Sequence, residues 1–448
     1  MVTKMQTKRK KNSRFKEFID NLKPMRVNSK MIKPVYLILL FNIFGFFLAL
    51  GSNEKGLDSK ALVYFLFATI LMFLANKYVI KITKGDGYIL QIACMLFSIG
   101  IIMIYRLNPY EGLKQIMWFT IGILLFFGTF FILKSYNKWY KFTAFYLIGC
   151  ILMFLITLVL AQDKYGARNW VSIFGIGFQP SEITKILYVF FLASYDYNTD
   201  MLDKIKLDSA HKYKKYLPII KRYFLMIVVY LFIGMFFLQK DLGTAMIFYG
   251  LFLVYQIVNQ EDIKLILLNL FIAIAGAVAA YMLFSHIRIR VSTWLDPWKN
   301  IDGIGYQITQ ALFAIASGGF FGTGLGLGRP DVVPVVTSDF IFAAICEEMG
   351  TFTGMGVIML FLILIYRGMK ISLYQSNKFY KIVALGISVI FAIQGLVMFG
   401  GVMKLVPLTG ITIPFVSYGG TSMAMSFICL AILQFCSTDQ GEEDIYAK

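Results

Sequence analysis

Long apolar stretches separated by short polar segments dominate the sequence. A membrane-spanning helix needs about 20 predominantly apolar residues. Twelve stretches approach or exceed that length, near residues 34–51, 61–80, 88–105, 115–133, 142–161, 181–196, 218–238, 242–259, 264–284, 339–366, 380–402 and 414–436. The sixth is the shortest and carries Glu182 and Lys185. The pattern predicts an all-α polytopic membrane protein.

Basic residues are concentrated in alternate connections between these stretches. The N-terminal tail, 1–33, holds eleven Lys and Arg against Glu17 and Asp20. Four connections carry further basic residues: 77–86, 134–141, 197–217 and 367–381. Because cytosolic loops of membrane proteins are enriched in Lys and Arg, we expect the tails 1–33 and 437–448 to be cytosolic. The basic N-terminal tail is also suited to contact anionic membrane lipids.

The composition agrees with a membrane setting. Hydrophobic residues make up 58% and charged residues 15% of the chain, whereas a soluble domain has about 25% charged residues. A net charge of +18 suggests nucleic-acid binding in a soluble protein, but here it resides in tails and short loops, so no nucleic acid is expected. The five cysteines and two histidines lack metal-site spacing, so we predict no protein-bound metal.

Three connections are expected on the outer face: 162–180, 239–241 and the long segment 285–338. Long structured loops are usually functional. Within 285–338, "YQITQALFAIASG" has the pattern of an amphipathic or re-entrant helix. The run "GGFFGTGLGLG" indicates tight turns or backbone pressed against a neighbour, and its spacing does not fit a nucleotide-binding motif.

Several charged residues lie within or beside the predicted spans. Glu182 and Lys185 share one helix face at i,i+3, either as a structural ion pair or as the polar wall of a substrate cavity. Asp241 begins a span, where it either caps the helix or faces a cavity. Arg288 and Arg290 are suited either to anchor the chain at the interface or to bind phosphate.

The segment "TSDFIFAAICEEMG" places Asp339, Glu347 and Glu348 at the start of the tenth stretch. A carboxylate within the bilayer costs about 2.5–3.5 kcal/mol. Helix capping would account for Asp339 alone. At 100° per residue, Glu347 lies within about 80° of Asp339 and Glu348 on the opposite side. We therefore expect Glu347 to share a cavity with Asp339, a candidate general base, and Glu348 to find a partner elsewhere.

Six segments of the chain resemble a known family. The segments "NWVSIFGIGFQPSEITK", "QKDLGTA", "DPWKNIDGIGYQITQALFAIASGG", "GTGLGLG", "SDFIFAAICEEMG" and "PLTGITIPFVSYGGTS" occur in the order typical of SEDS proteins (shape, elongation, division and sporulation). The resemblance covers about 88–436 and implies a ten-span core. The two spans within 34–87 are then an N-terminal addition. Lys240 departs from the family pattern, which has Pro there, and Val335 and Thr337 replace Glu and His.

The resemblance implies a peptidoglycan glycosyltransferase of the bacterial cytoplasmic membrane. It would polymerise lipid II onto the growing glycan strand, in division, elongation or sporulation, with a class B penicillin-binding protein as partner. Asp339 would be the catalytic base, and Glu182 and Lys185 the intramembrane acid–base pair. The expected substrate-binding residues are Glu182, Lys185, Asp241, Arg168, Arg288, Arg290, Gln307, Glu347 and Ser417.

By hypothesis, Asp339 takes the proton of the acceptor sugar's 4-hydroxyl, whose oxygen attacks the anomeric carbon of the growing chain. Arg288, Arg290 and Arg168 would neutralise the departing undecaprenyl diphosphate. A divalent cation, Mg²⁺ or Mn²⁺, could share this task. Two alternatives remain: a transporter that flips lipid II, and a non-enzymatic scaffold for a penicillin-binding protein.

Overall fold

The computed structural model describes residues 33–51, 59–164, 167–173, 176–204, 217–260 and 262–438. Most of the predicted tails, 1–33 and 437–448, therefore lies outside the described residues. The long helices are α2 (Lys33–Gly51), α3 (Ser59–Thr83), α4 (Ile89–Leu107), α5 (Pro109–Ser135), α6 (Thr143–Leu160), α7 (Pro180–Lys204), α9 (Leu217–Leu238), α10 (Leu242–Val258), α11 (Ile263–Leu283), α14 (Ile341–Tyr374), α15 (Lys378–Val402) and α16 (Gly420–Cys436).

Each of the twelve predicted spans corresponds to one of these helices, so the all-α polytopic prediction is confirmed. Eight of the described helices are long and apolar enough to cross a membrane, and three shorter apolar helices accompany them. Some boundaries differ from the prediction: α14 continues to Tyr374 rather than ending near 366, and α16 begins at Gly420 rather than near 414. The preceding chain is irregular, with Phe415 at a φ of +67°.

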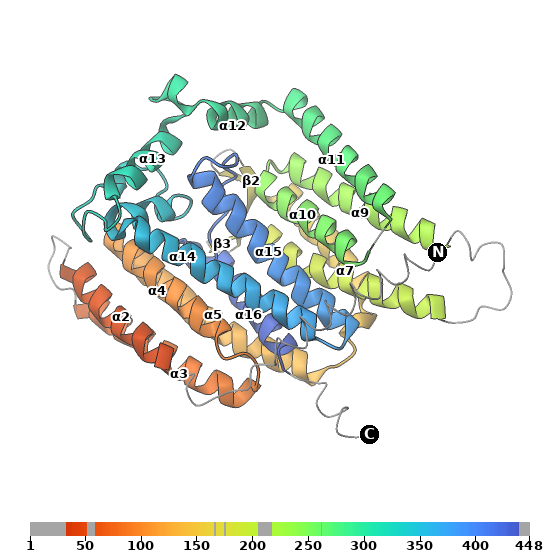
Figure 1. Cartoon of the computed structure of the whole chain (residues 1–448), viewed down its shortest axis with the longest axis horizontal. Coiled ribbons are helices and arrows are strands. Elements are labelled where there is room, and N and C mark those ends of the chain that lie inside the picture. The colour runs from red at the N-terminus through yellow and green to blue at the C-terminus, as the bar shows by residue number, and fades with distance from the viewer. Residues whose placement is uncertain are drawn as a thin grey trace, which may run out of the picture.

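The outer connections contain structure of their own. The segment 285–338 holds α12 (Ser285–Leu295), α13 (Tyr306–Gly318) and two short 3₁₀ helices, η3 (Pro297–Asn300) and η4 (Pro330–Val332). Helix α13 is the helix predicted from "YQITQALFAIASG". A small antiparallel sheet, which we did not predict, is formed by β1 (Gln162–Lys164), β2 (Ala167–Ile173) and β3 (Ile176–Phe178). Figure 1 shows α11, α12 and α13 forming an arch over one end of the bundle.

The segments predicted to be cytosolic gather at the opposite end of the bundle. Arg367, in the C-terminal part of α14, makes an ion pair of 2.6 Å with Asp86, which lies between α3 and α4. The backbone N–H of Asp86 in turn donates to Ser437 Oγ. Asn198 of α7 donates to the carbonyl of Tyr140, in the 3₁₀ helix η2 (Trp139–Lys141). These contacts bring together segments that lie far apart in the sequence.

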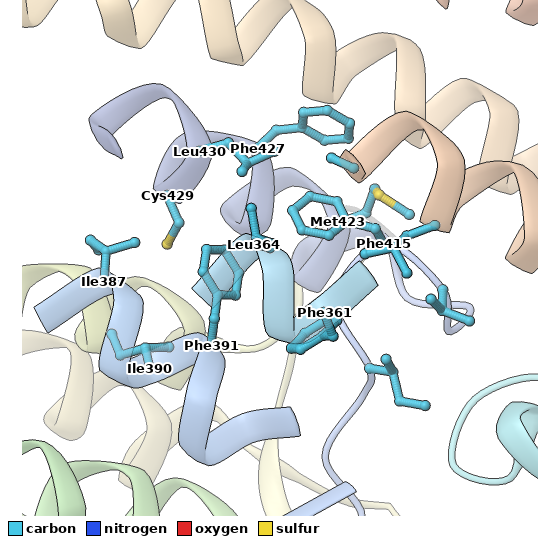
Figure 2. Packing of buried hydrophobic residues seen from close by; sticks show 14 of the residues in the cluster. Phe361, Leu364, Ile387, Ile390, Phe391, Phe415, Met423, Phe427, Cys429 and Leu430 are labelled. Atoms are coloured by element: carbon cyan, nitrogen blue, oxygen red, sulfur yellow. The ribbon is translucent and has the colours of Figure 1, made fainter. Parts of the chain in front are cut away.

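The core is centred on α4, α15 and α16, whose side chains are largely buried. Figure 2 shows Phe361 and Leu364 of α14 packed among residues of α15 and α16, including Phe391 and Phe427. Helices α2, α3, α6 and α11 are peripheral, and half or more of the apolar side chains of each are exposed. In a membrane protein such faces are suited to contact lipid.

The first two helices pack on one side of the bundle, against α4 and α5 (Figure 1). A buried asparagine of α2, Asn42, donates to Ser98 Oγ of α4 at 2.8 Å. Asn76 of α3 donates to the thiol of Cys94 in the same helix α4. Buried amides of this kind join helices within a membrane.

Candidate active site

A cavity of about 1080 Å³ lies at the end of the bundle that α12 and α13 cover. Its lining comes from the starts of α5, α7 and α10, the strands β2 and β3, helices α12 and α13, and the loops before α14 and α16. The predicted site residues that line it are Glu182, Asp241, Arg290, Gln307 and Asp339. These five come from separate parts of the sequence, and the fold brings them to one cavity.

Asp339 lies in the turn that precedes α14 and does not cap that helix. The N-cap residue is Phe340, which makes no side-chain capping bond. Ser338 Oγ donates to Asp339 Oδ1 at 3.0 Å. Burial raises the pKa of the Asp339 carboxyl, while the Ser338 hydrogen bond and the charge of Arg290 act in the opposite direction. A carboxyl whose pKa moves toward neutral is a better general base than an exposed one.

Arg290 of α12 lines the same cavity, and its charge acts on the Asp339 carboxyl. Its guanidinium Nη1 donates to the carbonyls of Thr409, at 2.9 Å, and Leu408, at 3.3 Å. Burial lowers the pKa of Arg290, and the charges of Asp241 and Asp339 oppose that shift. Arg290 is thereby fixed on the loop before α16 with two carboxylates nearby.

Arg288 was predicted to share this role and does not line the cavity. It is exposed on α12, whereas Arg290 is partly buried. Two residues that are two positions apart on a helix point in directions about 200° apart, so only one of them faces inward. For Arg168, which lies in β2, the side chain is outside the described residues.

Asp241 combines the two roles that the sequence left open. Its Oδ1 accepts from the backbone N–H of Thr244 at 3.1 Å and so caps α10. Its Oδ2 accepts from Asn169 Nδ2 of β2, also at 3.1 Å. The residue is buried and lines the cavity at the same time.

Glu182 and Lys185 form the predicted ion pair, with 2.9 Å between Nζ and Oε1. Both side chains are buried, and only Glu182 lines the cavity. Lys185 Nζ also donates to Gln394 Oε1 of α15 at 3.3 Å. Gln394 Nε2 donates in turn to the carbonyl of Thr412, a residue of the cavity wall. Sequence reasoning missed Gln394 because it is an uncharged residue 209 positions from Lys185.

The prediction for Glu347 was wrong, because this residue does not line the cavity. Its Oε1 accepts from the backbone N–H of Arg329 at 2.8 Å. Glu348 did find a separate partner, Arg106 of α4, at 2.6 Å. The angle of about 80° between Asp339 and Glu347 assumed that both residues belong to one helix. That assumption fails because the helix begins at Ile341, after Asp339.

The glycine-rich run after α13 is pressed against α14, as its composition predicted. Gly350 breaks the regular helix with φ +85° and ψ +157°. The backbone N–H groups of Thr323 and Gly324 donate to the carbonyls of Glu347 and Glu348 at 2.9 and 3.1 Å. A Cβ atom on Gly322 would lie 2.3 Å from the Glu348 carbonyl oxygen. Only glycine permits so close an approach.

Ser417 was predicted to line the cavity and instead supports its wall. Ser417 Oγ donates to the carbonyl of Ser338 at 2.7 Å and accepts from the backbone N–H of Ile413 at 2.9 Å. The next residue, Tyr418, donates its backbone N–H to the carbonyl of Thr337. These bonds join the loop before α16 to the turn that carries Asp339.

Sequence reasoning also missed Lys114 of α5 and Lys240, which both line the cavity. Lys240 had been noted only as a departure from the family pattern. Among the described residues, no group of three or more His, Cys, Asp or Glu is placed to hold a metal ion.

Comparisons with known proteins agree on one family. The family model for FtsW, RodA and SpoVE, described as "Cell cycle protein", matches residues 86–441. Peptidoglycan glycosyltransferase RodA of Mycobacterium tuberculosis is 34% identical over 373 residues, covering 78% of this chain and 77% of the relative. Stage V sporulation protein E of Bacillus subtilis is 29% identical, covering 79% of this chain and 97% of the relative.

Solved structures share the fold at lower sequence identity. A chain from a study of the structural coordination of polymerization and crosslinking by a peptidoglycan synthase complex has a TM-score of 0.64 at 22% identity, covering 80% of this chain and 99% of that chain. The rod shape determining protein RodA of Thermus thermophilus has a TM-score of 0.57 at 20% identity, covering 81% and 99%. On the family match and the relatives together, the chain belongs to the FtsW/RodA/SpoVE family of cell cycle proteins.

Proposed function

We propose that this protein is a peptidoglycan glycosyltransferase that polymerises lipid II at the outer face of the bacterial cytoplasmic membrane. The observation that carries the proposal is the cavity at one end of a multi-pass helical bundle, whose lining includes both Asp339 and Arg290. Relatives named as peptidoglycan glycosyltransferases support the same reaction.

In the proposed reaction, Asp339 accepts the proton of the acceptor sugar's 4-hydroxyl. That oxygen forms a bond to the anomeric carbon of the growing chain, and the bond from this carbon to the diphosphate breaks. Undecaprenyl diphosphate leaves with the bonding electron pair. Arg290 stabilises the negative charge of the leaving group, as preorganised cations do in transfer reactions. The proton then passes from Asp339 to solvent.

The other predicted residues have supporting roles in this proposal. Asp241 and Gln307 line the cavity and are placed to bind substrate. Glu182 lines the cavity, and its partner Lys185 reaches the loop before α16 through Gln394. A Mg²⁺ or Mn²⁺ ion would enter as the counter-ion of the substrate's diphosphate, since the described residues group no three metal-ligating side chains.

We also propose a partner and an orientation. A class B penicillin-binding protein would crosslink the strands, and the structural likeness to a chain studied in a peptidoglycan synthase complex supports such an assembly. Both termini would be cytosolic. The basic connections support this orientation, because those that the structure describes lie at the end of the bundle opposite to the cavity.

The test is incubation of the purified protein in detergent with lipid II, with and without a class B penicillin-binding protein, followed by gel separation of the products. We expect glycan polymers. A lipid II transporter or a scaffold would yield no polymer in detergent, where no second compartment exists. Transport of lipid II by the protein in vesicles, with no polymer in any of these mixtures, would contradict the proposal.

A further inference from the structure

Lys240 occupies the turn between α9 and α10 and lines the cavity. Its backbone N–H donates to the Phe237 carbonyl at 3.1 Å, and that of Asp241 donates to Phe236 at 3.0 Å. These bonds close the C-terminus of α9. Lys240 has a φ of +57°, a conformation that glycine adopts most easily at this position after a helix. The chain nevertheless places a long cationic side chain there.

The charges around this turn favour an incoming anion. Lys240 and Arg290 both line the cavity. Burial lowers the pKa of His286 in α12, and the charges of Arg290 and Lys240 lower it further. Among the described residues, the Lys240 ammonium makes no hydrogen bond or ion pair. His286 Nε2 is buried without a hydrogen-bond partner in the same described part. Asp241 and Asp339 oppose the charge of Arg290, whereas the unpaired Lys240 ammonium remains available to attract an anion into the cavity.

The position of Lys240 along the bundle favours one anion, the diphosphate. It lies between the ends of two apolar helices, Tyr223–Leu238 and Leu242–Val258, at the level where a membrane passes from hydrocarbon to headgroups. A substrate with a polyprenyl anchor must hold its diphosphate at this level. Carboxylates of an attached sugar or peptide would lie farther from the membrane.

We propose that Lys240 binds the diphosphate of the polyprenyl-linked substrate, next to Arg290. This inference rests on the proposed function, because it names the part of that substrate which the residue contacts. It also gives Lys240 the role of setting the preference for diphosphate over monophosphate lipids.

A simpler reading is that Lys240 only complements the negative C-terminal dipole of α9. Lys404 provides a matched comparison for that reading. It follows α15, has a φ of +61°, and closes the helix through a bond to the Gly401 carbonyl. Lys404 is not part of the cavity lining. The two lysines therefore share conformation and helix-terminal position and differ in access to the cavity.

The experiment measures binding of undecaprenyl diphosphate and undecaprenyl monophosphate to the purified full chain in detergent. Fluorescence of the cavity residues Trp170 and Trp294 is the readout. Lys240→Gly suits the local backbone and Lys240→Met retains the bulk, so loss of folding does not confound both. We expect each to weaken diphosphate binding about tenfold, the typical effect of one charge-assisted contact. Lys240→Arg should retain it, and Lys404→Gly should match the wild type.

Equal loss of monophosphate and diphosphate affinity in Lys240→Gly, or unchanged diphosphate affinity, overturns the inference. The same outcome in Lys404→Gly as in Lys240→Gly would also overturn it. Polymerisation of lipid II is measured in parallel. If the wild type polymerises lipid II and the Lys240 variants bind undecaprenyl diphosphate normally, the role of Lys240 is refuted and the proposed function stands. A wild type that binds diphosphate through Lys240 without polymerising removes the proposed function and leaves the diphosphate site standing.

Discussion

At the scale of single residues, the position of Asp339 results from a short network rather than from its helix. Ser338 donates to the carboxylate, and Ser417 holds the Ser338 carbonyl. Gly410 lies beside the carboxylate with a φ of +73°, a conformation that favours glycine. The sequence singled out Asp339 because an acid beside an apolar span is rare. It could not reveal the support from Ser417, because that contact joins residues 79 positions apart.

The pKa of Asp339 gives a prediction on pH. Only the deprotonated carboxylate can act as a base, so kcat/KM for polymerisation should fall as the pH drops through its raised pKa. Arg290 lowers that pKa, and Arg290→Gln should therefore move the acidic limb of the kcat/KM profile to higher pH. Arg288→Gln, on the exposed side of α12, is the control and should leave the limb in place. If the acidic limb of Arg290→Gln stays in place or moves to lower pH, Arg290 does not lower the pKa of Asp339.

At the scale of elements, two contacts hold the helices around the cavity. The ion pair of α7 reaches α15 through Gln394, and the glycine-rich run after α13 lies along the break in α14. The sequence predicted the helices closely because each has a long apolar stretch. It failed where irregular backbone contacts a helix, as at Glu347, since helical periodicity does not extend through the turn before α14.

The Glu182–Lys185 pair should show strong coupling. Removing one partner leaves a buried charge unpaired, at a cost of about 3–5 kcal/mol, whereas removing both leaves none. A double-mutant cycle on thermal stability with Glu182→Gln and Lys185→Met measures this. The Asp196–Lys378 pair, where the Lys378 side chain is 42% exposed, is the comparison and should couple weakly. Additive effects at Glu182 and Lys185 would show that the two charges do not interact.

Gly350 should be intolerant of any side chain. A Cβ atom there would lie 2.4 Å from the Phe320 carbonyl oxygen, and its φ and ψ are accessible almost only to glycine. We expect Gly350→Ala to lower the unfolding temperature and to reduce polymerisation. Gly356→Ala is the matched control in the same helix, because a Cβ there meets nothing within 4 Å. Similar unfolding temperatures for the two variants would mean that the break in α14 is not needed.

At the scale of the whole molecule, α2 and α3 lie at one side of the bundle and the cavity at one end. The family match begins at residue 86, after α3 ends at Thr83. The span of α2, 34–51, carries no Asp, Glu, Lys or Arg. About half of the apolar side chains of α2 and α3 are exposed. The sequence predicted the pair as an addition to the core. It did not predict the polar contact between Asn42 and Ser98.

A protein truncated to begin near residue 82 should therefore still insert and still polymerise lipid II. Loss of Asn42 does not leave Ser98 without a partner, because Ser98 Oγ also donates to the Cys94 carbonyl at 2.7 Å. Because α2 and α3 are two spans, removing both keeps the orientation of the remaining helices in the membrane. Gel filtration checks folding, and polymer yield checks activity. A monodisperse but inactive truncated protein would place α2 and α3 in the working core.

The most direct test of the central claim compares wild-type protein with Asp339→Asn on lipid II in detergent. Asparagine has nearly the same shape and cannot take up a proton at neutral pH. We predict glycan polymers from the wild type and none from the variant, with equal yields of folded protein by gel filtration. Polymer formation by purified Asp339→Asn at near the wild-type rate would contradict the assignment of Asp339 as the catalytic base.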